Sequence, residues 1–132
     1  MSDKVEGKFK IENWQEESYR EIDGGGKLTR ASVKQAFSGG IEGDGEVEWL
    51  LCYRPDDTAD FVGLQSVAGS VGERSGSFVL QVSGSFDGGE AKGDWTVVPG
   101  SGTGELGGLR GRGGFAAPLG SEAAVTLEYE FE

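Results

Sequence analysis

Histidine is absent from this 132-residue chain, and cysteine occurs once, at Cys52. Without imidazole, Ser-His-Asp and Cys-His catalysis and nearly all zinc or iron sites are excluded. A single cysteine excludes an internal disulfide and a Cys-rich metal centre, and its place between Leu51 and Tyr53 predicts a small, half-buried side chain. We therefore expect no metal and no cofactor, and an enzyme of this composition would have to use carboxylates, tyrosine, lysine or water.

Long apolar runs are also missing. No run approaches the roughly 18 residues of a membrane-spanning helix, and no basic-apolar-small leader is present. The formal net charge of −11 argues against nucleic acid and anionic membranes as partners, because both need a positive surface. Many glutamates alternate with apolar residues, which is typical of a solvated outer face and does not by itself identify a basic partner. We expect a cytoplasmic protein.

Alternation of apolar and polar residues dominates the chain and predicts β-strands. In the last such stretch, Val125, Leu127, Tyr129 and Phe131 alternate with polar residues. The pattern predicts eight strands, at residues 4–13, 27–38, 45–54, 58–70, 75–86, 90–98, 105–115 and 123–131. Sequential strands joined by short turns favour a single all-β domain, residues 1–132, folded as an antiparallel eight-stranded up-and-down β-barrel.

Two stretches between these strands have other properties. Trp14 is predicted to end the first strand, and the polar residues 15–23 to form a connection anchored by Tyr19 and Ile22. The glycine-rich stretch 95–115, where the strand predicted at 90–98 meets the one at 105–115, predicts a sharp corner, since glycine destabilises helices. The match of residues 102–107 to G-x-G-x-x-G lacks the helix that a dinucleotide site needs. The single RGRGG at 110–114 is better explained as a strand with exposed arginines than as an RNA-binding tract.

The blocks GLQSVAGSVGERSGSFVLQV (63–82) and WTVVPGSGTGELGGL (95–109) resemble a bacterial family of unknown function, domain-of-unknown-function family 3224. The resemblance runs from about Val5 to Phe131. It implies an eight-stranded antiparallel barrel of the allene oxide cyclase (calycin-like) type, and it implies no activity. The family pattern leads us to expect glutamate within G-x-E at position 65, where this chain has Gln65, so it lacks that carboxylate.

Candidate site residues are those predicted to face the barrel interior. They are the large rings suited to line a pocket, Trp14, Trp49, Tyr53, Trp95 and Tyr129, together with Gln65 and Glu105. Gln65 falls on the apolar face of its strand, and Glu105 lies at the glycine-rich corner. If Glu105 is buried, its pKa is raised, which makes it the candidate proton donor. The alternative is that the rings fill the barrel and Gln65 is hydrogen-bonded to its neighbours.

Three functions are compatible with this sequence. The first is a binding module that holds a small apolar or amphipathic molecule in the barrel. The second is a cyclase or isomerase that works by confinement plus a carboxylate. The third is an assembly protein with a filled core. Apolar residues predicted on the outer face favour a homo-oligomer in each case, and they are Leu50, Val62, Leu64, Val79 and Val98.

Overall fold

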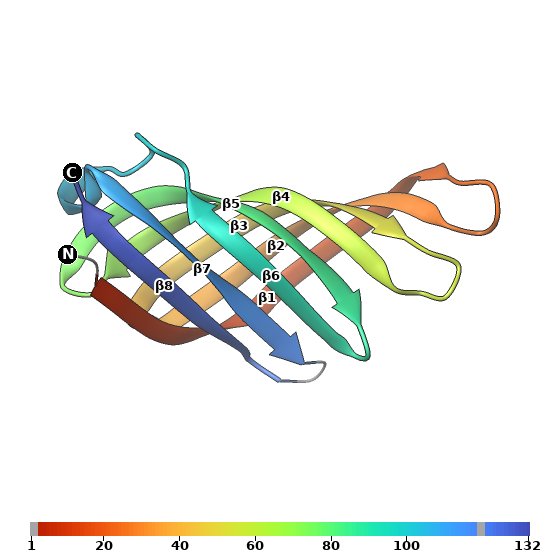
Figure 1. Cartoon of the computed structure of the whole chain (residues 1–132), viewed down its shortest axis with the longest axis horizontal. Coiled ribbons are helices and arrows are strands. Elements are labelled where there is room, and N and C mark those ends of the chain that lie inside the picture. Colours follow the sequence, from red (N-terminus) through yellow and green to blue (C-terminus); the bar gives the residue numbers. More distant parts are fainter. Residues whose placement is uncertain (1–2, 119–120) are drawn as a thin grey trace.

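The computed structural model describes residues 3–118 and 121–132, and these form a closed barrel of eight strands in sequential antiparallel order (Figure 1). The strands are β1 (Asp3–Glu21), β2 (Lys27–Gly39), β3 (Ile41–Tyr53), β4 (Ala59–Val71), β5 (Arg74–Asp87), β6 (Glu90–Val97), β7 (Leu109–Pro118) and β8 (Ala123–Phe131). β8 returns to pair with β1 and closes the wall. The predicted all-β, eight-stranded antiparallel barrel is confirmed.

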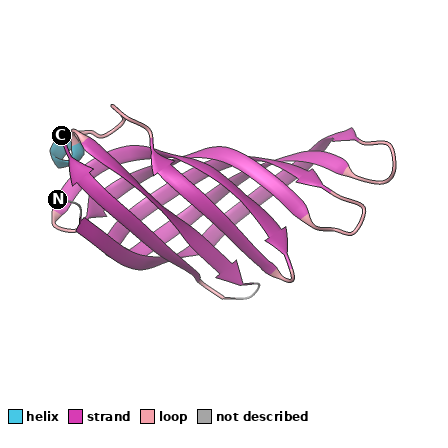
Figure 2. Cartoon of the chain, in the orientation of Figure 1, coloured by secondary structure: helices cyan, strands magenta, loops and turns pink. Residues whose placement is uncertain are grey.

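The two ends of the barrel differ. At the terminal end lie both chain termini and a short 3₁₀ helix, η1 (Gly104–Leu106) (Figure 2). At the hairpin end lie the turns that follow β1, β3 and β5, and the β1–β2 hairpin projects farthest (Figure 1). Leu106 and Leu109 are buried at the terminal end, where the loop between β6 and β7 is hydrogen-bonded to β5. The glycine-rich corner thus covers one end of the barrel.

The core is built from the inward-facing residues of every strand, as the alternation predicts. Buried apolar side chains include Val47 and Leu51 on β3 and Phe78, Leu80 and Val82 on β5. Four rings form its aromatic centre, and successive centroids lie 5.6 Å (Phe9–Phe115), 5.5 Å (Phe115–Trp95) and 6.5 Å (Trp95–Phe37) apart. Most of the barrel interior is therefore filled with side chains.

Three local predictions are wrong. The first strand does not end at Trp14 but continues to Glu21, and Tyr19 and Ile22 are exposed instead of anchoring a connection. β7 begins at Leu109, because residues 104–106 form η1. Cys52 is exposed, since its neighbours on β3 occupy the inward positions. Within residues 3–118 and 121–132, no helix has the length and apolar character needed to cross a membrane.

Candidate functional site

An opening in the barrel wall produces the site. β1 pairs with β8 only from Asp3 to Phe9, and beyond Phe9 its described pairing is with β2 alone. The opening leads into a cavity of about 630 Å³ at the hairpin end, which we call the mouth cavity. Its lining is formed by Phe9, Lys10, Ile11, Trp14, Trp49, Leu51, Tyr53, Phe61, Phe86, Ala91, Phe115, Ala117, Pro118, Ser121, Glu122 and Ala123. A concave site of this size with a mainly apolar lining is typical of small-molecule sites.

Aromatic rings form the deep wall of the mouth cavity. The Trp14 and Trp49 rings lie 5.4 Å apart between centroids, and Trp49 lies 5.2 Å from Phe61. Room for Trp49 comes from its cross-strand neighbours, since it pairs with Ala31 on β2 and with Gly63 on β4. A Cβ atom at Gly63 would lie 2.7 Å from Cδ1 of Trp49. The sequence thus places its smallest residues where the largest ring needs space.

A carboxylate joins the projecting hairpin to the cavity wall. Glu16 accepts hydrogen bonds from Nε1 of Trp14 at 3.0 Å, from Oγ1 of Thr29 at 2.7 Å and from the hydroxyl of Tyr53 at 2.8 Å. Trp14 and Tyr53 line the mouth cavity, whereas Thr29 is buried beneath them. Glu16 therefore holds the side chains of Trp14 and Tyr53 in place at the cavity wall.

These contacts shift two pKa values. Partial burial raises the pKa of Glu16, but the hydrogen bonds from Thr29, Tyr53 and Trp14, with the charge of Lys27, outweigh it and lower that pKa below its ordinary 4.5. Partial burial, the hydrogen bond to Glu16 and the charge of Glu16 raise the pKa of Tyr53 to about 12. Nζ of Lys27 lies 5.1 Å from the centre of the Tyr53 ring. At neutral pH the cluster is an ionised carboxylate bound to a neutral phenol.

The structure brings together three of the five predicted rings, namely Trp14, Trp49 and Tyr53. Trp95 is buried in the core instead, and its indole N–H donates to the carbonyl of Thr126 at 3.1 Å. Tyr129 lies on β8 toward the terminal end, with its ring 6.0 Å from that of Phe131. Neither is among the residues that line the mouth cavity.

Gln65 faces inward, as predicted, and hydrogen-bonds to a second buried amide. Its Nε2 donates to Oε1 of Gln35 on β2, and both side chains are 1% exposed. Nε2 of Gln35 and Oε1 of Gln65 have no partner among the described residues. Gly45 lies beside the pair, since a Cβ atom there would be 3.2–3.3 Å from the two amides. The pair is a polar contact within the filled core.

Glu105 does not meet the condition for a raised pKa, because its side chain is not buried. Glu105 lies in η1 at the terminal end, opposite the mouth cavity, and is exposed. It accepts hydrogen bonds from the backbone N–H of Ser75 at 3.2 Å and from its hydroxyl at 3.0 Å. The backbone bond and then the hydroxyl bond lower its pKa. Glu105 fastens the glycine-rich loop to the start of β5.

Sequence reasoning missed Glu16 and Gln35, although both had a signal. Glu16 lies two residues after Trp14, so an extended strand puts the two on one face. Gln35 lies between Val33 and Phe37 at the inward spacing of β2. Glu16 lies in a stretch predicted to be a connection, and Gln35 lies in the predicted strand 27–38 but is not among the predicted site residues.

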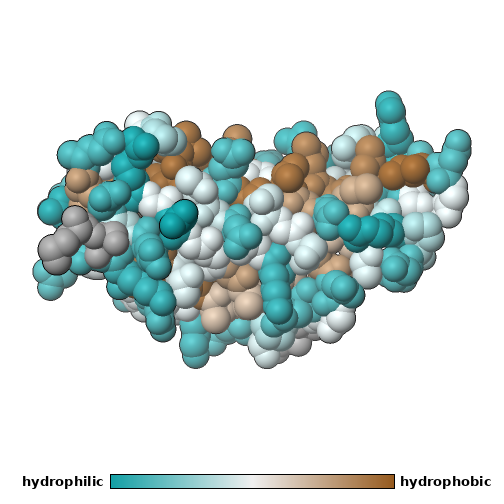
Figure 3. All heavy atoms as spheres, viewed as in Figure 1, coloured by the Kyte–Doolittle hydropathy of each residue, from teal (hydrophilic) through white to brown (hydrophobic). Residues whose placement is uncertain are grey.

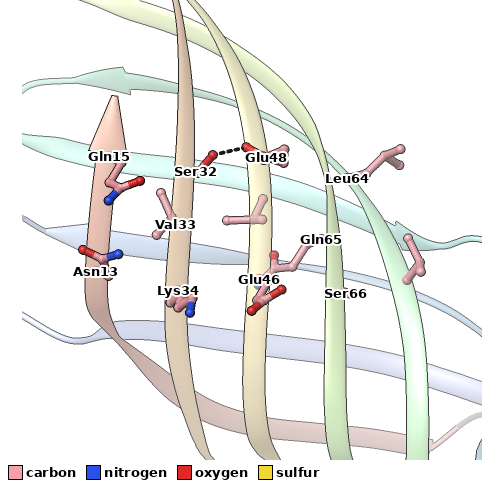
Figure 4. A pocket seen from close by; sticks show the side chains of 12 residues that line it. Asn13, Gln15, Ser32, Val33, Lys34, Glu46, Glu48, Leu64, Gln65 and Ser66 are labelled. Carbon is pink, nitrogen blue, oxygen red and sulfur yellow. Dashed lines mark hydrogen bonds between the residues drawn. The ribbon is translucent and has the colours of Figure 1, made fainter. Parts of the chain in front are cut away.

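A second hollow, of about 490 Å³, lies on the outer face over β1 to β5 (Figure 4). Polar side chains are among its lining residues: Asn13 and Gln15 come from β1, and Ser32 of β2 donates to Glu48 of β3 at 2.5 Å. On the face seen in Figure 3, hydrophobic side chains gather along the upper edge, where β4 and β5 run in Figure 1. In the described part of the chain, no group of three or more acidic or cysteine side chains is arranged to hold a metal ion.

Comparison with known proteins identifies the family. Residues 5–129 match the model of the family described as "Protein of unknown function (DUF3224)", and the chain belongs to this family. It is similar to the crystal structure of a protein of unknown function from the same family in Shewanella oneidensis MR-1. The two chains are 31% identical, with a TM-score of 0.85, over 100% of this chain and 99% of the other. No curated protein matches the sequence.

Proposed function

We propose that this protein binds a small apolar or amphipathic molecule in the mouth cavity. The observation that carries the proposal is the cavity of about 630 Å³ at a break in the wall of an otherwise filled barrel. Its size lies within the roughly 300–1,000 Å³ of typical ligand sites. Trp14, Trp49 and Phe61 line the cavity with aromatic carbon, against which an apolar body can pack.

The polar groups at the cavity are few, which is the usual arrangement of a site that orients its ligand. Tyr53 and Trp14 are held by Glu16, so their rings are positioned before a ligand arrives. Such preorganisation reduces the entropy lost on binding. Glu122 lines the cavity, and Glu16 is hydrogen-bonded to the lining side chains of Trp14 and Tyr53. Glu105 lies at the opposite end of the barrel. The assignment to allene oxide cyclase-type barrels belongs to this proposal and rests on the sequence resemblance.

Native mass spectrometry of gently purified protein tests the proposal. We expect an added mass of a few hundred daltons per subunit, on the scale of ligands that fill such cavities, and its loss on denaturation. Ala91→Phe fills the cavity and should abolish the added mass, because Ala91 lines it. Ala124→Phe adds the same ring on the outer face and should retain it.

Two outcomes would contradict binding in the mouth cavity. One is a bare protein mass that stays bare after incubation with neutral aromatic probes such as 2-acetylnaphthalene. The other is equal retention of ligand by the Ala91→Phe and Ala124→Phe variants. Circular dichroism of both variants shows whether they keep the fold.

We also propose that the outer face of β3 and β4 mediates self-association. Leu50 and Val62 are direct cross-strand partners, and Leu64 follows two residues after Val62 on the same face. All three are about half exposed, at 48%, 54% and 57%. Adjacent exposed apolar side chains on a highly charged chain favour burial in an interface. Sedimentation of the Val62→Glu variant as monomer beside a wild-type oligomer supports this, and a monomeric wild type at micromolar concentration would contradict it.

A further inference from the structure

The unpaired edge of β1 is a second candidate binding feature, distinct from the small-molecule site in the mouth cavity. From residue 10 onward, β1 is hydrogen-bonded within the described chain to β2 alone, whereas its first residues pair on both sides. All of residues 10–21 are exposed. An unpaired strand edge presents free backbone N–H and C=O groups, which another extended chain can pair with.

Two irregularities limit the part of this edge that can pair. The β1–β2 register shifts between Ile11 and Asn13 and again between Ser18 and Arg20. Bulges interrupt regular pairing and twist the strand. The regular stretch between them, residues 13–18, is the part of the edge available to a partner strand.

This stretch lies beside the mouth cavity. Lys10, Ile11 and Trp14 line the cavity, and Trp14 and Glu16 extend toward the inner side of the hairpin through their contacts with Trp49 and Tyr53. A strand added along β1 would therefore direct every second side chain toward the cavity. In strand addition, backbone hydrogen bonds supply affinity and pockets for alternate side chains supply specificity.

Charge decides which chain would fit. Residues 10–21 carry four glutamates, at positions 12, 16, 17 and 21, against Lys10 and Arg20. In antiparallel pairing of two copies through residues 13–18, Glu16 and Glu17 would lie opposite Gln15 and Trp14 of the second copy, one or two positions from the glutamates of that copy. Like charges this close repel, and each chain carries a net charge of −11. The edge repels a second copy and attracts a basic strand.

We propose that the edge of β1 at residues 13–18 binds an extended, positively charged segment of a partner protein by strand addition, with an apolar side chain of that segment entering the mouth cavity. This goes beyond the proposed small-molecule site, because it uses backbone groups that a small ligand in the cavity does not need. The same opening in the wall exposes the edge and gives access to the cavity.

The test is an NMR titration of ¹⁵N-labelled protein with the peptide acetyl-KVKFKVK-amide. We expect saturable shifts and slowed amide exchange centred on residues 13–18, with affinity falling as salt is raised. The acidic analogue acetyl-EVEFEVE-amide should not bind. A version of the basic peptide with N-methyl groups on its three central residues keeps its charge but loses backbone N–H donors on both edges of the peptide strand. This version should not bind.

Two variants separate the edge from general acidity. Glu17→Gln removes an exposed charge within the edge and should weaken binding roughly two- to fivefold, the range of an exposed ion pair. Glu73→Gln, in the β4–β5 turn at the terminal end, makes the same charge change and should leave affinity unchanged. Failure of acetyl-KVKFKVK-amide to bind at about 1 mM, or equal binding of its N-methylated form, would overturn strand addition.

The apo protein and the small-molecule site provide two further readouts. A dimer whose amides at residues 13–18 are protected without peptide would overturn the choice of partner. Binding of 2-acetylnaphthalene is measured in the same samples, so failure of the peptide leaves the small-molecule site to its own test. Ala91→Phe should weaken the binding of acetyl-KVKFKVK-amide more than that of acetyl-KVKGKVK-amide, because only the former has a ring to place in the cavity. An equal loss of affinity for both peptides would show that the side chain does not enter the cavity.

Discussion

The hydroxyl of Tyr53 on β3 donates a hydrogen bond to the carboxylate of Glu16 on β1 at 2.8 Å, although β2 lies between these strands in the sheet. Thr29 on β2 donates to the same carboxylate at 2.7 Å. Three consecutive strands are thus joined on their inner side at the hairpin end. This contact positions the β1–β2 hairpin over the mouth cavity. It also makes the stability of this end of the barrel depend on pH.

At alkaline pH, ionisation of Tyr53 should weaken the fold. Its pKa is raised from 10.0 to about 12. The folded state therefore holds the proton more tightly than the unfolded state, and the stabilisation is complete below pH 10 and lost between about pH 10 and 12. Ultraviolet titration of phenolate, with Tyr53→Phe to assign its share, should show that the Tyr53 share ionises near pH 12. A midpoint near 10 for Tyr53 would contradict the contact with Glu16.

At acidic pH, protonation of Glu16 should lower the stability of the fold as the pH falls. Because its pKa is lowered from 4.5, its stabilisation is present above about pH 4.5 and is lost as the pH falls through the lowered value. Glu16→Gln should flatten this part of the stability–pH curve, measured by urea unfolding. Glu73→Gln is the control, and an identical curve for both variants would show that Glu16 has no such role.

The buried Gln35–Gln65 pair should behave as a coupled unit. Replacing one glutamine by leucine leaves the other amide buried without a partner, which costs about 1–3 kcal/mol. Replacing both by leucine removes both polar groups and should cost less than the sum of the single changes. Chemical unfolding of the four proteins in a double-mutant cycle gives the coupling energy. Strict additivity would mean that the amides do not depend on each other.

Gly63→Ala should disturb the mouth cavity and the fold together. The new Cβ atom would lie 2.1 Å from the carbonyl oxygen of Glu48 and 2.7 Å from Cδ1 of Trp49. We expect a loss of about 1–3 kcal/mol, as for other overpacked positions, and a changed tryptophan emission spectrum. Gly107→Ala is the matched control, because its Cβ would be 3.5 Å from its nearest neighbour. Comparable melting temperatures for both variants would contradict this reading of Gly63.

Glu105→Gln should leave ligand binding in the mouth cavity unchanged. Glu105 lies at the terminal end, where Ser75 donates its hydrogen bonds. The expected effect is faster amide exchange in the loop of residues 98–108, measured by hydrogen exchange, with no change in affinity for 2-acetylnaphthalene. A loss of affinity for 2-acetylnaphthalene in this variant would show that Glu105 does contribute to ligand binding.

Sequence alternation predicted most of the strand residues where one side of a strand is buried, although β3 begins at Ile41 and not at the predicted residue 45. Val47, Trp49 and Leu51 on β3 face inward because a strand with one buried face must alternate. The prediction failed at residues 14–21, where both faces of β1 are exposed and the strand exists because β2 pairs with it. A stretch without a buried face need not alternate apolar and polar residues, so only the pairing with β2 makes residues 14–21 a strand.

The sequence by itself determined the barrel and its order of strands, because short turns join strands that follow one another in the chain. It also determined the inward position of Gln65, Trp49 and Tyr53, because side chains alternate along a strand. The tertiary structure decided which inward residues meet. It joined Glu16 to Tyr53 across β2, separated Glu105 and Tyr129 from the mouth cavity, and left the edge of β1 unpaired. Those outcomes depend on strand register and on where β8 begins beside β1, and neither is encoded in the pattern of a single strand.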